Sequence, residues 1–458
     1  MASTDATTTA PASPARVGLI HAWPVLLLAL AISAVCEVIG QVSLDVGIGA
    51  IVLFPMVWGI LIGTLVSVQK FKPMGLTSQK VASAVVAAAV MFLVARLAFN
   101  IGPSLPTLVE AGPALLLQEV GHLLGTIFLA LPLAVALRMG RSTVGATFSL
   151  DREPSFAIVS EKYGADSDEY RGVLGMYVFG TLFGAVYITL LASFISSLDV
   201  FDPLALAMGA GVGSGSMMAA ATGSIIAEYP AQEQAITAMA AVANLLTTVL
   251  GVYVGIYIAL PLARRMYAAM TRGRDNATAS PSGMLGEHRP DKASVGQDEA
   301  NRSFREQFAA ASATVTLPLI ISIPAIVGIG IVTASIAAGA FSWDIVIGYA
   351  EITALVVLSL ILGKVTRVIS PIIWITTLGA LASSPWSPIG ESLATSVSSI
   401  SLLSLATIML TTAGLSLGKD IPLLRSIGWK MIPVGLVAIT ASFVLSAVIA
   451  EFALGFWS

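Results

Sequence analysis

The chain has 458 residues, of which 56% are hydrophobic and only 11% are charged, and its mean hydropathy is +0.90. Soluble domains carry about 25% charged residues, so this composition indicates an all-α protein that crosses a membrane several times. The formal net charge of −3 gives no basis for nucleic-acid binding, and the single cysteine, Cys36, excludes an internal disulfide framework.

Residues 1–15 are rich in Ala, Ser, Thr and Pro, which predicts a disordered N-terminal tail over 1–23 rather than a cleaved signal. A spanning helix needs about 20 apolar residues. Two segments are ambiguous, because 103–119 holds three prolines and 203–228 holds a glycine cluster. Eleven segments are predicted spans: 24–45, 48–69, 80–101, 120–138, 172–197, 233–263, 309–338, 344–363, 367–383, 391–415 and 430–455.

The polar gap 264–306 carries eight arginines and lysines, and we expect it to be a cytoplasmic linker. It divides the chain into a first membrane half, 24–263, and a second membrane half, 307–458. Other basic loops also favour the cytoplasmic side: 70–80, 138–171, 364–367 and 419–430.

These loop assignments agree only if 203–228 enters and leaves on the same face, as a re-entrant or broken hairpin, with 103–119 as a second partial segment. The alternative is that both cross fully, which places Arg138 and Arg141 outside. The first arrangement puts the N-terminus in the cytoplasm and gives spans two to six and seven to eleven opposite orientations. Such inverted five-helix repeats are typical of alternating-access transporters.

Segment 209–223 is the strongest indication of function. Each glycine costs a helix about 1 kcal/mol against alanine, so a helix breaks here, and the break frees backbone N–H and C=O groups. A carboxylate or a cation could bind such groups, and the alternative is close packing of small residues. We assign substrate binding to Gly213, Ser214, Gly215, Ser216 and Met217.

The run from Asp202-Pro203 through this break to Pro261 and Arg264 resembles the sodium/glutamate symporters over roughly 65 residues. Ser214 stands where the symporters have histidine, and Ser216 where they have threonine, which leaves glutamate specificity in doubt. The whole chain resembles an uncharacterised bacterial membrane-protein family within the wider bile acid, arsenite and riboflavin transporter group. The resemblance implies scaffold and core domains, two crossing broken helices, sodium or proton coupling, and a homodimer.

A second candidate region contains Thr147, Ser149 and Glu153. It reads either as a gate that completes the substrate site or as a solvated cytoplasmic helix with local ion pairs. Glu119 and His122 lie three residues apart, so they share a helix face. Ionisable groups within a span are functional candidates, and we assign both to ion coupling, the alternative being a hydrogen-bonded pair at a kink.

Asn244 and Thr247 follow the break and share a helix face, so they could coordinate sodium with carbonyls from the break, or simply hydrogen-bond between helices. Helix 391–415 is rich in hydroxyls and is expected to be the broken helix that faces the first one. There, Ser398 and Ser399 are assigned to the solute site and Thr411 to ion coupling. The alternative is that these hydroxyls bond to their own helix.

Together these features predict a secondary-active, elevator-type transporter of a small organic solute, a carboxylate or amino acid, in a bacterial cytoplasmic membrane. A cation/proton antiporter and a passive export channel are the alternatives. No ATP-binding motif, hydrolase motif or metal-ligand set is apparent, so neither an enzyme nor a cofactor other than Na⁺ is expected.

Overall fold

The computed structural model describes residues 15–16, 18–45, 50–148, 154–163, 167–211, 213–271, 303, 315–366, 371–420 and 428–457. Over these residues the protein is helical apart from two small two-stranded sheets. Two apolar helices, Pro55–Val68 and Pro371–Ala382, are shorter than a usual span. Within the described parts of the chain, eight segments are long and apolar enough to cross a membrane: Ala22–Ile39, Leu76–Ile101, Gly112–Ala136, Asp168–Ser196, Leu319–Ala337, Trp343–Thr366, Leu402–Asp420 and Met431–Gly455.

The elements follow in chain order. The first part comprises β1 (Ala15–Arg16), α1 (Leu19–Ile39), β2 (Val42–Asp45), β3 (Ala50–Leu53), α2 (Pro55–Val68), α3 (Leu76–Ile101), α4 (Leu105–Glu110), α5 (Gly112–Gly125), the π-helical turn η1 (Thr126–Ala130), α6 (Leu131–Ala136), α7 (Ser142–Thr147) and α8 (Pro154–Tyr163). The middle part comprises α9 (Asp168–Phe179), η2 (Gly180–Gly184), α10 (Ala185–Ser196), α11 (Pro203–Ala210), α12 (Gly215–Glu228), η3 (Pro230–Gln232), α13 (Glu233–Val254), η4 (Gly255–Ala259) and α14 (Leu260–Thr271). The last part comprises β4 (Val315–Thr316), α16 (Leu319–Ala337), α17 (Trp343–Thr366), α18 (Pro371–Ala382), α19 (Gly390–Ser398), α20 (Leu402–Ser416), η6 (Leu417–Asp420) and α22 (Met431–Trp457).

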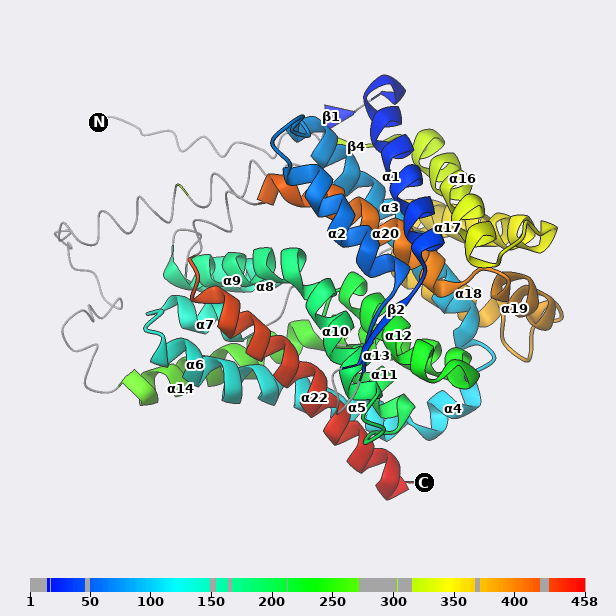
Figure 1. Ribbon diagram of the computed structural model, residues 1–458. Coiled ribbons are helices and arrows are strands. Elements are labelled where there is room, and N and C mark those ends of the chain that lie inside the picture. Colours follow the sequence, from blue (N-terminus) through cyan, green and yellow to red (C-terminus); the bar gives the residue numbers. More distant parts are fainter. Residues whose placement is uncertain are drawn as a thin grey trace.

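The helices form two groups that lie side by side (Figure 1). The first bundle comprises α1, α2, α3, α16, α17, α18, α19 and α20, in which α2 packs along α20 and α3 packs on α18 and α20. The second bundle comprises α5 to α14 and α22, in which α22 packs along α5 and α11, and α12 packs along α10. The bundles meet mainly where α3 contacts α13 and α20 contacts α12.

The two bundles do not coincide with the two halves of the sequence. The last helix, α22, belongs to the second bundle, whose other helices all end at or before Thr271. Conversely, α1, α2 and α3 pack with helices that follow the linker. Each bundle is therefore completed by helices from both halves of the chain.

The predicted spans 24–45 and 48–69 are wrong at their adjoining ends. Helix α1 ends at Ile39, and Gly40 follows with a φ of 70°, a left-handed conformation that favours glycine. The next residues form the antiparallel hairpin β2–β3, in which Val42 pairs with Leu53. Valine and isoleucine favour extended backbone, and an apolar count does not distinguish such a strand from a buried helix.

Segment 103–119 is not a separate partial span. A continuous helical path of 25 residues runs over Gly112–Ala136, which joins the end of this segment to the predicted span 120–138. Pro106 and Pro113 lie in the first turns of α4 and α5, where a missing N–H costs no helical hydrogen bond. The π-helical turn η1 directly precedes the first turn of α6, which contains Pro132 and its missing N–H.

Three further bounds differ from the prediction. The helix after the break extends through α14 to Thr271, so the predicted linker 264–306 begins as helix, and most of its remainder lies outside the described residues. In the predicted span 309–338, residues 309–314 lie outside the described residues, Val315–Thr316 form strand β4, and helix α16 begins at Leu319. The predicted helix 391–415 is interrupted at 399–401 and forms α19 and α20.

Helices α11 and α12 form a hairpin, as the charge pattern of the loops requires. The Ser224 hydroxyl donates to the carbonyl of Thr189 at 3.1 Å, so α12 runs back alongside α10. At the base of the hairpin, the Tyr229 hydroxyl lies 3.0 Å from the Ser196 carbonyl and 3.1 Å from Asp199 Oδ1. The segment therefore starts and ends at the same end of the bundle, and it turns around in the interior.

Close helix packing relies on glycines spaced four residues apart. A Cβ at Gly121 would lie 2.5 Å from the Leu445 carbonyl oxygen, and one at Gly125 would lie 2.6 Å from the Ala441 carbonyl oxygen. The α5 and α22 backbones therefore touch directly. Gly63 and Gly414 do the same between α2 and α20, with built Cβ contacts of 2.6 Å and 2.5 Å to opposing carbonyl oxygens.

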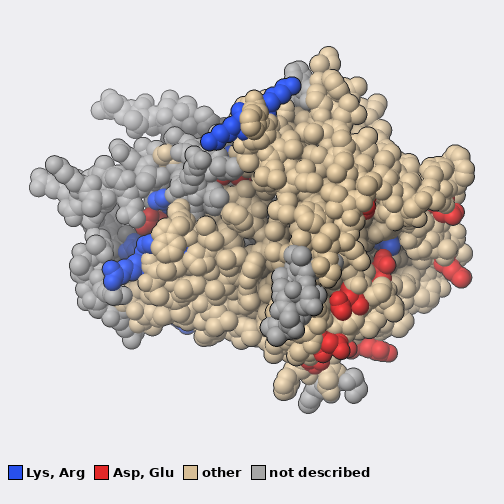
Figure 2. Space-filling model, in the orientation of Figure 1, with Lys and Arg blue, Asp and Glu red and all other residues tan. Residues whose placement is uncertain are grey.

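Charged side chains separate toward opposite ends of the molecule on the face shown in Figure 2, with Lys and Arg mainly at one end and Asp and Glu mainly at the other. The acidic end includes the base of the hairpin, where the backbone N–H of Asp202 donates to Glu451 Oε2 at 2.7 Å. Burial and the neighbouring Asp199 carboxylate raise the pKa of Tyr229 to about 12.

Candidate functional site

The tip of the hairpin comprises a short non-helical turn, with Gly211, Gly213 and Ser214, and the first two residues of α12, Gly215 and Ser216; Val212 lies outside the described residues. Gly213 has a φ of 97°, a conformation that side chains with a Cβ rarely adopt. Because α11 has 8 residues and α12 has 14, the tip lies about 12 to 21 Å along the helix axes from the base. This places the break well inside the bundle.

Ser214 begins the second arm of the hairpin as a helix cap. Its hydroxyl accepts a hydrogen bond from the Met217 N–H at 3.4 Å and lies 3.0 Å from the Ser216 hydroxyl. Ser214, Gly215 and Ser216 are only half-buried, whereas Met217 and the rest of α12 up to Ile226 are buried. Among the described residues, a Cβ at Gly215 would meet only Val90 of α3, at 4.0 Å, so these residues leave space in front of this helix N-terminus.

Asn244 fixes the tip to α13. Its side-chain Nδ2 donates to the carbonyl oxygens of Gly211 at 2.8 Å and of Gly213 at 3.1 Å. These are carbonyls that the break releases from helical hydrogen bonding. If sodium bound at the break, it would lie between these two carbonyl oxygens. The Asn244 amide nitrogen occupies that position instead, and an amide N–H and a cation compete for the same oxygens.

Thr247 links the same face of α13 to Glu119. The Thr247 hydroxyl contacts both Glu119 Oε1 and, at 2.9 Å, the carbonyl of Ala243. Gln118 Nε2 also donates to Glu119 Oε1, at 3.0 Å. Glu119 is 6% exposed, and Gln118 and Thr247 are fully buried. A buried carboxyl group therefore lies one turn of α13 beyond the residue that holds the tip.

His122 extends this cluster to α22. Its Nδ1 lies 2.6 Å from the Ser442 hydroxyl, and the Ser446 hydroxyl donates to the Gln118 carbonyl at 3.0 Å. The close contact of the α5 and α22 backbones through Gly121 and Gly125 sets these distances. A carboxyl group, an imidazole and several hydroxyls thus form one polar cluster in the interior of the second bundle.

Two kinds of chemistry are available here. The N–H groups and hydroxyls at the start of α12 suit an anion, since a helix N-terminus carries partial positive charge. The Glu119–His122 cluster contains two groups that exchange protons. Among the described residues, no three His, Cys, Asp or Glu side chains are placed to hold a metal ion.

The structure thus brings together five of the residues predicted for the tip and four predicted for ion coupling, all in the second bundle. The tip residues are Gly213, Ser214, Gly215, Ser216 and Met217, and the others are Glu119, His122, Asn244 and Thr247.

Ser398, Ser399 and Thr411 are placed elsewhere. Ser398 and Ser399 donate to carbonyls of their own helix, both at 2.6 Å. The carbonyl of the neighbouring Ile400 accepts a hydrogen bond from Arg96, and Arg96 is paired with Glu233. Glu233 lies eleven residues, or about 16 Å, along α13 from Asn244, the residue that holds the tip. The bend between α19 and α20 therefore does not face the tip, and Thr411 packs against Gly59 inside the first bundle.

Thr147 also lies away from the tip. It is buried in α7 and donates to the Thr143 carbonyl at 2.8 Å. Helix α7 packs on α9 and α14, in a small second core that includes Phe148. Ser149 and Glu153 lie outside the described residues.

Sequence reasoning missed Ser442 and Ser446 as members of the polar cluster, and it assigned no role to Gln118, which directly precedes Glu119. Ser442 and Ser446 are four residues apart in an otherwise apolar helix, which places both on one face. That spacing was available from the sequence, but the partner helix was not, because α5 and α22 are more than 300 residues apart in the chain.

Fold and polar cluster define a class: a multi-pass helical membrane protein with a hairpin whose tip ends inside its bundle. The family model described as "Protein of unknown function (DUF3100)" matches residues 34–269, which is more than half of the chain. The protein therefore belongs to this family. The match includes the hairpin, α5 and α13, whereas α22 follows it. No curated protein and no solved structure matches the chain.

Proposed function

We propose that the protein is a secondary-active transporter of a small organic solute, a carboxylate or an amino acid, with coupling to sodium ions or protons. The observation that carries this proposal is the hairpin tip in the interior, held beside a buried carboxyl group. Irregular backbone at membrane depth is tolerated only where protein buries it or where it lines a polar cavity. Transporters place solute sites at such breaks.

The half-buried start of α12 is the proposed solute site. A carboxylate in front of Gly215 would accept hydrogen bonds from the free N–H groups of the first turn and from the Ser214 and Ser216 hydroxyls. Each charge-assisted bond of this kind contributes about 1.5 to 3 kcal/mol. The serines that replace the symporters' histidine and threonine still supply donors, which is compatible with an anionic solute.

The Glu119–His122 cluster is the proposed coupling site. Asn244 and Thr247 connect it to the tip through a single face of α13. A change in the charge of the cluster is therefore transmitted to the hairpin by direct contacts. Because Asn244 already satisfies the carbonyls of the break, proton coupling through Glu119 and His122 needs fewer rearrangements than sodium binding at those carbonyls.

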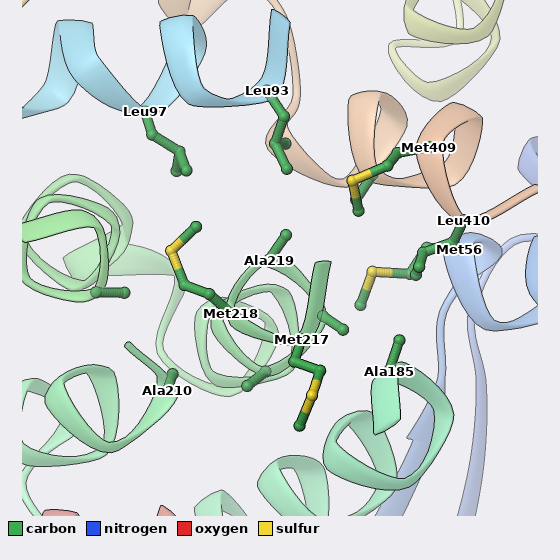
Figure 3. Close-up of a cluster of buried hydrophobic side chains, with 14 of the residues drawn as sticks. Met56, Leu93, Leu97, Ala185, Ala210, Met217, Met218, Ala219, Met409 and Leu410 are labelled. Atoms are coloured by element: carbon green, nitrogen blue, oxygen red, sulfur yellow. The ribbon is translucent and has the colours of Figure 1, made fainter. Parts of the chain in front are cut away.

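The interface between the bundles is suited to sliding. Figure 3 shows Leu93 and Leu97 of α3 and Met409 of α20 facing Met218 and Ala219 of α12. Methionine adapts its shape readily, and apolar contacts have no fixed direction. We therefore infer an elevator-type movement of the second bundle against the first.

The remaining features of the proposal follow from charge and resemblance. The basic end faces the cytoplasm of a bacterial cell by the positive-inside rule, which places the N-terminus inside. Eleven spans with inverted five-helix repeats, and assembly as a homodimer, complete the proposal on the basis of the resemblance to the symporters.

Ligand-dependent thermal unfolding tests the solute site. We expect one member of a panel of carboxylates and amino acids to raise the unfolding temperature, since a ligand at 100 times its Kd stabilises the folded state by about 2.7 kcal/mol. Each compound is measured in sodium chloride and in choline chloride. Ser214→Leu and Ser216→Leu should abolish the shift, and Ser398→Leu, on the distant bend, should retain it.

Uptake into proteoliposomes then tests transport itself. Concentrative uptake that requires a sodium or proton gradient supports the proposal. If Ser214→Leu took up the solute at the wild-type rate, the tip would not be the solute site. The same conclusion would follow if Ser398→Leu abolished the ligand-dependent rise in unfolding temperature as fully as Ser214→Leu does. Flux that equilibrates the solute but never concentrates it would identify a channel.

A cation/proton antiporter is the second candidate, because the buried Glu119–His122 cluster could carry protons without any organic solute. Proton flux driven by a cation gradient, in liposomes that contain no organic solute, would favour it. In that case Glu119→Gln should eliminate the flux, whereas Ser214→Leu should leave it largely intact.

A further inference from the structure

Arg96 is a buried cation at the contact between the two bundles. It lies near the end of α3 in the first bundle, and its side chain is only 3% exposed. Its Nε donates to the Ile400 carbonyl at 2.8 Å, and its Nη1 donates to Asn100 Oδ1 at 2.9 Å. These neutral partners belong to the first bundle and fix the guanidinium there.

The charge of Arg96 is balanced from the other bundle. Its Nη2 lies 3.4 Å from Glu233 Oε1, and Glu233 is the first residue of α13. Among the residues that the structure describes, this is the one ion pair that joins the bundles. Glu233 follows directly after the base of the hairpin, so the pair connects α3 to the segment that carries the tip.

Any sliding of the second bundle must separate this pair. A buried charge that loses its partner is strongly destabilising, because neither water nor another charge replaces the lost interaction. Glu233 can be hydrated, since its side chain is 40% exposed, but Arg96 cannot. Arg96 therefore needs a second acceptor if the bundles are to occupy two stable positions.

The first bundle contains such an acceptor. Tyr349 of α17 is fully buried, its hydroxyl has no hydrogen-bond partner among the residues that the structure describes, and it interacts electrostatically with both Arg96 and Glu37. Glu37 of α1 has one carboxylate oxygen, Oε1, that is also buried and has no partner. The Glu37 carboxyl group also has a side-chain hydrogen bond with Thr407, so Oε1 is the oxygen that remains available. Buried polar atoms without partners are costly, so Glu37 Oε1 and the Tyr349 hydroxyl would gain from a cation.

We propose that Arg96 is a two-position latch that exchanges Glu233 of the second bundle for Tyr349 and Glu37 of the first bundle when the bundles move. The proposal rests on the proposed function, because it assumes that the bundles move. In the present position Glu233 holds the bundles together, and the Tyr349 hydroxyl and Glu37 Oε1 have no hydrogen-bond partner among the described residues. In the other position the charge of Arg96 is balanced within its own bundle, and Glu233 faces water.

Electron-paramagnetic-resonance distance measurements test the latch without any solute. Spin labels at Ala231→Cys, after the hairpin, and at Ser392→Cys, on α19, report the separation of the bundles at exposed positions in a Cys36→Ala background. The reference protein should show one dominant distance. Glu233→Gln should raise the ratio of a second distance to the first by about tenfold or more, because it removes the charge that favours the present position.

Two further variants make the exchange specific. Glu37→Gln added to Glu233→Gln should remove the second distance, because Arg96 then has no carboxylate to move to. Glu233→Asp retains the charge and should keep the reference distribution, as should Glu228→Gln, which removes an exposed carboxylate at the same end.

An unchanged distribution in Glu233→Gln overturns the latch. A second distance that persists when Glu37 is also replaced overturns the exchange. Because the labels report position and not flux, these outcomes are independent of uptake. Altered distances without any uptake would reject the transporter while the latch stands, and uptake with unaltered distances would reject only the latch.

Discussion

The close contact between α5 and α22 predicts a large difference between two glycine substitutions in the same bundle. In Gly121→Ala the new methyl group would lie 2.5 Å from the Leu445 carbonyl oxygen, so the helices must separate by about 0.9 Å to reach the 3.4 Å of ordinary contact. Overpacking of this kind costs about 1 to 3 kcal/mol. Alanine also favours the helix by about 1 kcal/mol, which leaves a net loss of about 1 kcal/mol.

Gly251→Ala is the matched control, because Gly251 is also helical and a Cβ there meets nothing within 4 Å. It should gain the helix-forming contribution without the clash, so the two variants should differ by about 2 kcal/mol. Equilibrium unfolding in mixed detergent micelles measures both. If Gly121→Ala were as stable as Gly251→Ala, the α5–α22 contact as described would be refuted.

Three other substitutions test the hairpin and the polar cluster. Asn244→Asp replaces the donor between two carbonyl oxygens by an acceptor. This variant should lower the free energy of unfolding by about 2 to 4 kcal/mol. If sodium ions instead raised the stability of the variant, a cation would be supported between those carbonyls. Tyr229→Phe should lose about 1 kcal/mol at pH 8. The pKa of Tyr229 in the folded protein, about 12, lies above the ordinary value near 10, so the stabilisation by Tyr229 is complete below pH 10 and declines as the pH rises toward 12. In thermal unfolding, the difference in stability between wild type and Tyr229→Phe should therefore narrow between about pH 10 and about pH 12. A difference that stays constant would contradict the hydrogen-bonding role of the Tyr229 hydroxyl. Glu119→Gln should remove the pH dependence of ion-coupled uptake, and an unaltered pH profile in that variant would exclude Glu119 from coupling.

The hairpin could be predicted from the sequence because local and global signals agree there. Asp202-Pro203 is a helix start, Gly213 supplies the left-handed turn, and Ser214 is a helix cap. The basic loops on either side independently require an even number of crossings. A feature specified both by backbone chemistry and by charge is recognisable without tertiary contacts.

The β2–β3 hairpin and the bend between α19 and α20 could not be predicted in the same way. Apolar runs such as 48–53 suit a strand and a helix equally, and a hydropathy window does not separate them. Helix 391–415 carries many hydroxyls, but Ser398 and Ser399 bond to their own helix, which is the alternative that the pattern had left open. Whether a hydroxyl faces a site or its own backbone depends on neighbours that are distant in sequence.

The polar cluster was only half visible for the same reason. Glu119, His122, Asn244 and Thr247 stand out because ionisable and amide groups are rare in apolar spans. Their assembly requires α5 to lie between α13 and α22, and on the α22 side the helices approach through glycine contacts whose partners are backbone carbonyls. Backbone atoms leave no sequence pattern, so this half of the cluster needed the structure.

The place of α22 in the second bundle has a consequence for biosynthesis. Domains are made from the N-terminus at about 5 to 20 residues per second, so α5 and α11 wait many seconds before the last helix emerges. Until then, the glycine face of α5 and the surface of α11 lack their native neighbour, and His122 lacks Ser442. The bundle that contains the polar cluster is thus completed last. A nascent chain that stops short of Met431 has Glu119 and His122 but lacks α22, the helix that supplies Ser442 and Ser446 to the cluster.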